Sequence, residues 1–246
     1  MEKFVVAGIQ RTGTTLIRTT LDKHSQCRCF GETFLFKKGR GGKLEGSYRR
    51  FINQNKYRRL LAHYLSRKKL VDEYLSSFFD KYQEYEAVGF KVMGTQVKQF
   101  PSIISYCQEK NIKVIFVIRE NYLRTYLSRL SLQQNRIPHS NKKIAVKKVK
   151  VPVRSLIAKL KKIQKESLWP ERAFSGNPII KVTYEDFVSN KTKELERIFN
   201  FLSVEPQAEI ESDLVKVNPN NLQDYVVNYE EVKNRLNGTE FECFFY

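Results

Sequence analysis

The residues with the clearest chemical potential form a glycine-containing segment near the start of the chain, Gly8-Ile9-Gln10-Arg11-Thr12-Gly13-Thr14-Thr15. The spacing of its two glycines almost matches the phosphate-binding loop GxxxxGK[ST]. In such loops, backbone N–H groups surround an anion and the next helix directs its positive end toward it. The position of the usual lysine holds Thr14, and the positive charge is carried by Arg11 instead. The segment therefore predicts a binding site for a phosphate-like anion.

A second candidate anion site follows the most apolar segment of the chain, Ile112–Ile118. An ATPase needs the loop lysine to reach the outer phosphates and a strand-ending aspartate to hold Mg²⁺. Here the apolar segment ends at Arg119, and Ser128 follows nine residues later. An arginine cannot ligate a metal ion, but it can bind a phosphate through charge-assisted hydrogen bonds. These departures favour a ligand whose phosphates are held by arginine, threonine and serine, without a metal.

Together, the two segments resemble the motifs of the sulfotransferase family. Gln10–Leu16 looks like the family's 5′-phosphosulfate loop, and Arg119–Ser128 looks like its 3′-phosphate motif. The resemblance implies the donor 3′-phosphoadenosine 5′-phosphosulfate (PAPS), the product adenosine 3′,5′-bisphosphate (PAP) and no metal ion. Both motifs would then hold one doubly phosphorylated adenosine, which requires that Arg11 and Arg119 face a common cleft.

The resemblance also implies roles for single residues. Arg11 would stabilise the bridging oxygen of the donor, where negative charge develops as the sulfuryl group leaves. Arg119 and Ser128 would bind the 3′-phosphate; the alternative for Arg119 is an ion pair with Glu120 or Asp186. The other loop residues become candidates for donor binding, with simple helix capping as the alternative for the threonines: Thr12, Gly13, Thr14, Thr15 and Leu16.

Weaker matches to the family lie in the same order along the chain. Gly31–Phe34 follows the expected second strand, and Gly89–Met93 belongs to the third. Val182–Asp186 resembles the family's Y-E-D segment, in which Tyr184 is either an adenine contact or a core aromatic residue. Asn228–Thr239 is similar to the C-terminal stretch of bacterial carbohydrate-type members. It adds Gly238 and Thr239 to the candidates for donor binding.

The acceptor hydroxyl needs a general base. The cytosolic small-molecule members of the family are expected to carry a histidine two residues beyond a strand lysine, but Lys91 is followed by Met93. Carbohydrate-type relatives use a glutamate, and Glu32 fits that position; a structural or acceptor-binding role is the alternative. Lys91 either steadies the sulfuryl group or extends from the strand end. The histidines are interpreted as solvated: His24, His63 and His139.

Short apolar runs that alternate with helical spacing predict how these residues are positioned. Strands are expected at Lys3–Gly8, Cys27–Phe30, Ala87–Met93, Ile112–Ile118 and Pro178–Val182. Helices are expected at Gly13–Asp22, Tyr48–Ser66, Val71–Tyr85, Pro101–Lys110, Asn121–Gln134, Arg154–Ser167 and Lys191–Leu202, and Asn228–Glu231 resembles a capping box. Such alternation predicts one α/β domain over residues 1–246, with a parallel sheet of about five strands flanked by helices. The resemblance makes it the nucleoside-phosphate-binding (P-loop, sulfotransferase) type.

The chain is strongly basic, with 44 lysine and arginine residues against 26 acidic residues and a net charge of +18. Arg49–Val71 and Arg136–Arg172 carry most of the surplus, whereas the part from Thr183 onward is acidic. Such a field attracts anions, although solvated helix faces would give the same pattern. The expected partner is a hydroxyl-bearing acceptor, by resemblance a carbohydrate or glycolipid. No specific nucleic acid is expected, and the basic stretches leave peripheral membrane contact open.

Two other functions stay open at this point: a nucleotide kinase with a degenerate loop, and a nucleic-acid-binding protein that uses the basic part of the chain. The apolar run Val5–Ile9 is too short for a membrane span or a signal peptide, and Met1 leads almost directly into a strand. The four cysteines lack paired spacing and indicate reduced thiols. We therefore expect a complete cytoplasmic protein, with a lumenal domain cut from its anchor as the alternative.

Overall fold

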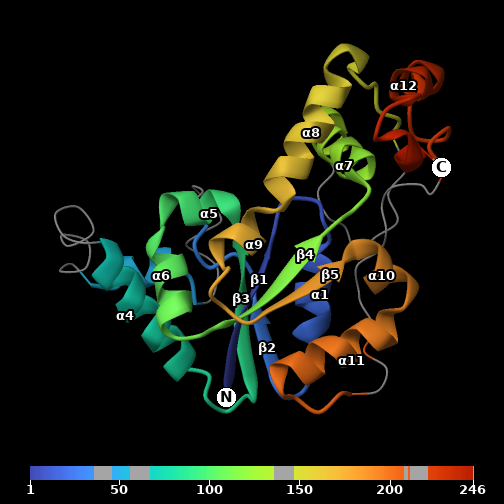
Figure 1. Ribbon diagram of the computed structural model, residues 1–246. Coiled ribbons are helices and arrows are strands. Elements are labelled where there is room, and N and C mark those ends of the chain that lie inside the picture. Colours follow the sequence, from blue (N-terminus) through green and yellow to red (C-terminus); the bar gives the residue numbers. More distant parts are fainter. Residues whose placement is uncertain (36–45, 56–66, 136–146, 208–209, 211–220, 246) are drawn as a thin grey trace.

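Five strands form one sheet in which all neighbours run parallel (Figure 1). The computed structural model describes residues 1–35, 46–55, 67–135, 147–207, 210 and 221–245. The strands are β1 (Glu2–Gly8), β2 (Cys27–Phe30), β3 (Ala87–Met93), β4 (Lys113–Ile118) and β5 (Ile179–Thr183). Their order is β2-β3-β1-β4-β5, which confirms the predicted parallel α/β architecture. β1 lies beside β4, with Gly8 opposite Val117, so the two candidate anion motifs begin at neighbouring strand ends.

The helices follow the predicted alternation, with additional short elements. They are α1 (Thr14–Leu21), α2 (Tyr48–Asn53), α4 (Arg67–Asp80), α5 (Gly94–Gln99), α6 (Ser102–Glu109), α7 (Tyr122–Asn135), α8 (Leu156–Ser167), α9 (Trp169–Ala173), α10 (Tyr184–Ser189), α11 (Lys191–Leu202) and α12 (Tyr229–Leu236), with 3-10 turns η1 (Val153–Ser155) and η2 (Glu242–Phe245). The sequence did not predict α5, α9 and α10. The helix expected through Ser66 is seen only to Asn53, and residues 56–66 lie outside the described ranges. No helix in the described ranges is long and apolar enough to cross a membrane.

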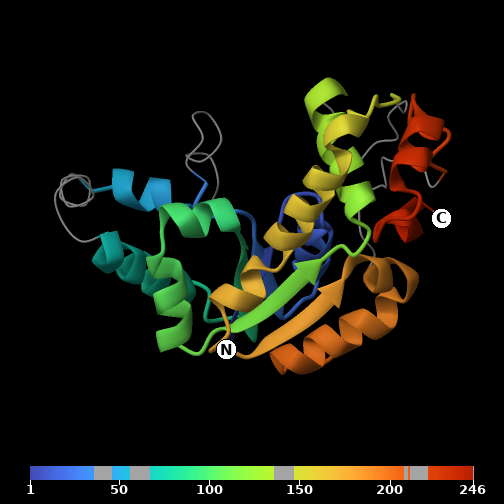
Figure 2. The ribbon, with the colours of Figure 1, turned by 45° about the horizontal axis from the view of Figure 1, so that its top comes forward.

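The side chains of β1 point alternately to the two faces of the sheet, and the apolar core is divided between these faces. Val5 and Ala7 pack with residues of α2, α4 and α6, whereas Phe4 and Val6 pack with residues of α1, α10 and α11. Successive side chains of a strand point to opposite faces, so one fully buried strand supplies both layers. Figures 1 and 2 show α4 and α6 on one side of the sheet and α11 on the other. This three-layer arrangement leaves the carboxyl ends of the strands as the edge where loops can gather.

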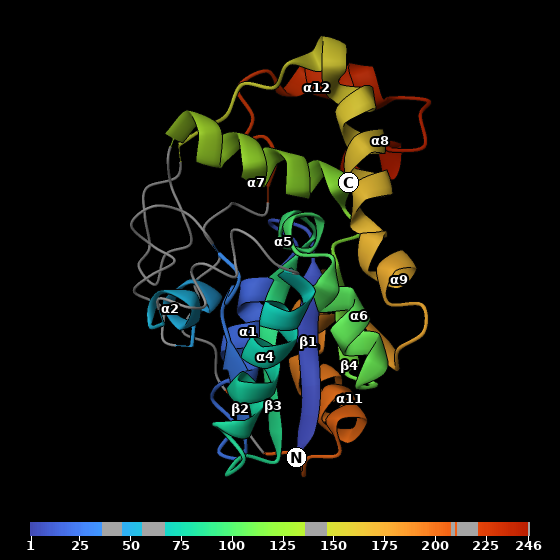
Figure 3. The ribbon, with the colours of Figure 1, turned by 90° about the vertical axis from the view of Figure 1, so that its left-hand side faces the viewer.

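A third apolar cluster lies beyond that edge, where α7, α8 and α12 come together (Figure 3). There the predicted capping box at Asn228 is wrong. α12 does begin after Asn228, but the Asn228 amide pairs instead with Val151, accepting from its N–H and donating to its carbonyl, each at 2.9 Å. The side chain is thereby used to join α12 to the segment before α8, and it makes no capping bond to the backbone of its own helix.

Candidate active site

The loop after β1 turns through two left-handed residues. Arg11 has a φ of 74° and Gly13 a φ of 93°. Thr12 lies between them, fully buried, and its hydroxyl donates to the Ile9 carbonyl at 2.8 Å. A positive φ is uncommon for arginine and is typically tolerated where function requires it. Left-handed residues that alternate in this way direct N–H groups toward a common point and form anion-binding concavities.

Gly13 is also the N-cap of α1, so the first turn of this helix receives no side-chain cap from that position. Another residue would not fit at position 13, because a Cβ atom would lie 2.6 Å from the Tyr184 ring. Thr14 is buried in this first turn, whereas Thr15 and Leu16 are half-buried and Leu16 packs against the core. The N-terminus of α1 carries the positive end of the helix dipole and has no side-chain cap from Gly13. It lies beside the turn of Arg11, and its first-turn N–H groups are therefore available to an anion.

Arg11 and Ser128 are brought together by the fold. Arg11 Nε donates a hydrogen bond of 2.7 Å to the hydroxyl of Ser128, a buried residue of α7. The loop after β1 and the helix after β4 therefore meet at one place. This contact joins the two motifs that the sequence suggested separately.

Arg119 follows β4 and lies over the ring of Tyr184, with 4.5 Å between Cζ and the ring centroid. The predicted alternative partners were Glu120 and Asp186, but the carboxylate that Arg119 meets is Glu185, at 3.9 Å between Nε and Oε1. Arg119 Nε is buried and has no hydrogen-bond partner among the described residues. Glu185 is instead hydrogen-bonded to backbone N–H groups that precede α7, those of Glu120 and Asn121, at 3.1 and 3.2 Å.

Arg11, Arg119, Arg124 and Ser128 form what we call the arginine cluster. Burial lowers the pKa of all three arginines, and the neighbouring charge of Arg119 lowers the pKa of Arg11 and Arg124 further. Burial raises the pKa of Tyr225, which lies within the field of the same arginines. Arg124 and Tyr225 were not predicted from the sequence. The spacing of Arg124 and Ser128, one helical turn apart on α7, was a signal that could have identified Arg124.

Glu32, Lys91, Gln96 and Thr15 form a second group, the carboxylate cluster. Lys91 Nζ lies 3.0 Å from Glu32 Oε1 and donates to the Thr15 hydroxyl at 3.0 Å. Gln96 Nε2 donates to Glu32 Oε2 at 3.2 Å. Lys91 is only 9% exposed, so it does not extend into solvent from the strand end. Through Lys91, the candidate base is connected to the first turn of α1, which follows the loop that carries Arg11. Gln96 was not predicted from the sequence.

Trp169 lies between the end of β1 and the start of α5. Its indole Nε1 donates to the Gly8 carbonyl at the end of β1, at 3.1 Å. A Cβ atom on Gly94, at the start of α5, would lie only 3.2 Å from the same nitrogen. The indole therefore packs closely between the loop that begins after β1 and the helix that carries Gln96.

The remaining candidates form hydrogen bonds to residues outside the two clusters. Gly238 N bonds to Glu242 at 2.9 Å and the Thr239 hydroxyl to the Leu236 carbonyl at 2.6 Å, both within the C-terminal segment. This segment reaches the start of α7, where Asn121 Nδ2 donates to the Phe244 carbonyl at 3.0 Å. The interpretation of His24 as solvated is wrong, because it is 4% exposed and its Nε2 bonds to the Glu205 carbonyl. His63 and His139 lie outside the described residues.

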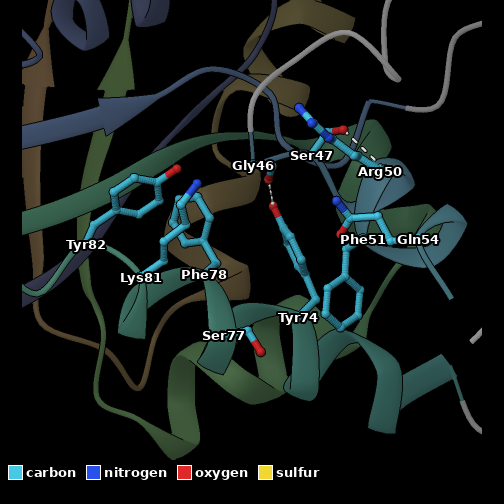
Figure 4. Close-up of a pocket in the computed structure, with 10 residues that line it drawn as sticks. All are labelled: Gly46, Ser47, Arg50, Phe51, Gln54, Tyr74, Ser77, Phe78, Lys81 and Tyr82. Carbon is cyan, nitrogen blue, oxygen red and sulfur yellow. Dashed lines mark hydrogen bonds between the residues drawn. The ribbon is translucent and has the colours of Figure 1, made fainter.

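A cavity of about 470 Å³ lies between α2 and α4 (Figure 4). Its walls include aromatic rings and two cations, and Figure 4 shows Arg50 and Lys81 at separate places along it. The buried hydroxyl of Tyr82 has no hydrogen-bond partner among the described residues. α2 is tied to the segment that carries Glu32, because Tyr48 N donates to the Thr33 carbonyl at 3.0 Å. The cavity and the carboxylate cluster therefore adjoin the same stretch of chain.

Metal ligands are not grouped in the described ranges: no three His, Cys, Asp or Glu side chains there come together as a metal site requires. The expectation of metal-free chemistry stays a prediction. Cys27, Cys29, Cys107 and Cys243 are all free thiols.

Comparison with known proteins gives the chain a family. A search of curated proteins gives no match. Among solved structures, the sulfotransferase domain of the Synechococcus PCC 7002 olefin synthase aligns over 97% of this chain and 88% of its own, at 15% identity and a TM-score of 0.51. A sulfotransferase from Alicyclobacillus acidocaldarius aligns over 100% and 96%, at 12% identity and a TM-score of 0.49. The similarity to the olefin synthase domain supports the fold alone. A family model described as "Sulfotransferase family" matches residues 3–208, and the chain therefore belongs to the sulfotransferase family.

Proposed function

We propose that the chain transfers the sulfuryl group of PAPS to a hydroxyl group of a carbohydrate or glycolipid, without a metal ion. The observation that carries this proposal is the 2.7 Å hydrogen bond from Arg11 to Ser128. It joins the predicted 5′-phosphosulfate loop to the predicted 3′-phosphate motif, as a donor with phosphates at both ends of one nucleoside requires. Family membership favours sulfuryl transfer over the alternatives of a nucleotide kinase or a nucleic-acid-binding protein.

The geometry of the arginine cluster supports donor binding at both ends. At the 5′ end, the left-handed turn of Arg11 and Gly13 and the uncapped start of α1 favour an anion. At the 3′ end, Arg119 has a buried Nε that no described side chain satisfies. A buried polar group without a partner is costly, and a phosphate oxygen would supply that partner. Tyr184, which lies against Arg119, is our candidate for the adenine contact.

The proposed transfer is one in-line displacement. The acceptor oxygen forms a bond to sulfur while the bond from sulfur to the bridging oxygen of the donor breaks. The electron pair of the broken bond stays on PAP, where Arg11 stabilises the charge. Glu32 accepts the proton of the acceptor hydroxyl. Lys91, between Glu32 and the Thr15 hydroxyl, is in position to stabilise the sulfuryl oxygens as the group crosses.

The proposed acceptor class is supported by the cavity between α2 and α4. Sites for small polar molecules combine apolar and aromatic walls with a few polar groups that fix orientation. The cavity provides Phe51 and Tyr74 as aromatic walls, Gln54 as a hydrogen-bonding group and the cations Arg50 and Lys81. Such a lining suits the C–H faces and hydroxyls of a sugar. Its volume, about 470 Å³, lies in the range of ligand pockets.

Thermal unfolding with two nucleotides tests the donor assignment. PAP should raise the Tm, because a ligand at about 100 times its Kd stabilises the fold by about 2.7 kcal/mol. ATP with Mg²⁺ at the same concentration should raise the Tm much less. Stabilisation by ATP with Mg²⁺ and not by PAP would overturn the proposed donor and favour a kinase.

A further inference from the structure

Gln96 has both ends of its amide engaged inside the protein. Its side chain is 4% exposed. Gln96 Oε1 accepts from the Met93 backbone N–H at 2.9 Å, and Nε2 donates to Glu32 Oε2 at 3.2 Å. These partners fix the orientation of the amide, because a flipped amide would set an oxygen against the carboxylate and an N–H group against an N–H group. Gln96 therefore serves as a donor toward Glu32.

The Glu32 carboxylate is held on both of its oxygens by different kinds of group. Lys91 is paired with Oε1 at 3.0 Å, and Gln96 with Oε2 at 3.2 Å. With Lys91 alone, the carboxylate could rotate about its Cγ–Cδ bond and still keep the ion pair, because the attraction to a point charge has little directional preference. A neutral amide donor on the second oxygen opposes that rotation without adding a second positive charge.

We propose that Gln96 is a positioning residue for sulfuryl transfer, which holds Glu32 in the orientation that accepts the acceptor proton. The inference rests on the proposed role of Glu32 as the base. Gln96 itself has no direct role in bond making. It is anchored through Met93 N, at the junction of β3 and α5, so the carboxylate is held by the backbone of the sheet.

Two substitutions separate positioning from a purely structural role. Gln96→Glu keeps an oxygen that can accept from Met93 N and replaces the donor to Glu32 by an acceptor. Gln96→Leu removes both bonds. The matched control is Gln99→Glu, which makes the same chemical change at an exposed residue of the same helix. The measurement is ³⁵S transfer from labelled PAPS to octyl β-D-glucopyranoside, and to water when that sugar is absent, with Tm and PAP affinity measured for each variant.

Positioning predicts that both Gln96 variants lose about ten- to a hundredfold in kcat, the range that a small misplacement of a catalytic group costs. The KM for PAPS and the affinity for PAP should stay unchanged, and Gln99→Glu should resemble the wild type. In a protein that already carries Glu32→Gln, adding Gln96→Glu should lower kcat little further, because Gln96 acts through Glu32.

A merely structural role predicts a different pattern, in which Gln96→Leu lowers the Tm and Gln96→Glu retains full kcat. That result, or a loss from Gln96→Glu that persists undiminished beside Glu32→Gln, would overturn the inference. If Glu32→Gln alone kept full turnover, the proposed base would fail, and with it the premise of the inference. The two failures are therefore distinguishable.

Discussion

The arginine cluster and the carboxylate cluster lie at the same edge of the sheet but balance their charge differently. In the carboxylate cluster, Lys91 pairs with Glu32 and the remaining bonds come from neutral groups. In the arginine cluster, positive charges lie close enough that Arg119 lowers the pKa of two neighbours, and its own ion pair with Glu185 is long. Both oxygens of Glu32 have a partner in the carboxylate cluster, whereas the arginine cluster holds a surplus of positive charge.

This difference indicates what each cluster is built to receive. A neutral hydroxyl can approach the carboxylate cluster without a large change in charge. A partly buried group of like charges is unfavourable by itself and becomes favourable when a multivalent anion enters. The contrast therefore supports the proposed anionic donor on one side and a neutral acceptor hydroxyl on the other.

The largest effect should come from the carboxylate cluster. Glu32→Gln removes the proposed base, so turnover should fall by about 10²- to 10⁴-fold, while PAP affinity stays near that of the wild type. ³⁵S transfer and calorimetric titration with PAP measure the two quantities. Equal losses in turnover and PAP affinity would contradict the division of roles between the clusters.

Arg119→Ala should have the opposite signature. Charge-assisted hydrogen bonds contribute about 1.5–3 kcal/mol, so PAP binding should weaken by roughly ten- to a hundredfold. The Tm without ligand should change little, because the substitution also relieves repulsion on Arg11 and Arg124. The control is Arg197→Ala on α11, where Arg197 bonds to Glu194 and to the Lys181 carbonyl. That control should lower the Tm and leave PAP affinity intact; the reverse pattern would refute the prediction.

A smaller effect is expected where the arginine cluster is supported by the C-terminal segment. Asn121 Oδ1 accepts from Arg124 N at 2.9 Å, and Asn121 Nδ2 donates to the Phe244 carbonyl at 3.0 Å. Asn121→Ala removes both bonds, with a loss of about 1 kcal/mol in stability, as for other capping residues. PAP affinity should fall about fivefold if all of that loss is transmitted to Arg119, and about twofold if half of it is. Unchanged PAP affinity in calorimetry would show that the C-terminal segment does not support the cluster.

The fold could be predicted largely because its strands are short apolar runs with clear limits. Ile112–Ile118 is apolar on both faces in sequence, and β4 is buried on both faces in the structure. Short helices such as α5 and α10 carry too few turns for their periodicity to be visible. The capping box at Asn228 failed because tertiary contacts with Val151 compete for the same side chain.

The candidate site was predictable where contiguous motifs carry it, and less so elsewhere. Arg11, Arg119 and Ser128 were identified from local spacing, and the fold brings Arg11 to Ser128. Gln96 and Tyr225 escaped because each acts through partners that are distant in sequence: Glu32 for Gln96, and the three arginines for Tyr225. His24 was misjudged for a related reason, since its bond to the Glu205 carbonyl spans most of the chain.

The bond from Trp169 to the Gly8 carbonyl has a practical consequence. Trp169 is the only tryptophan of the chain, and its indole donates to the carbonyl of Gly8, after which the turn of Arg11 and Gly13 begins. Indole emission responds to the polarity and hydrogen bonding of its surroundings. With excitation that avoids the tyrosines, the intrinsic emission of the protein therefore reports on the end of β1, where the loop that carries Arg11 begins.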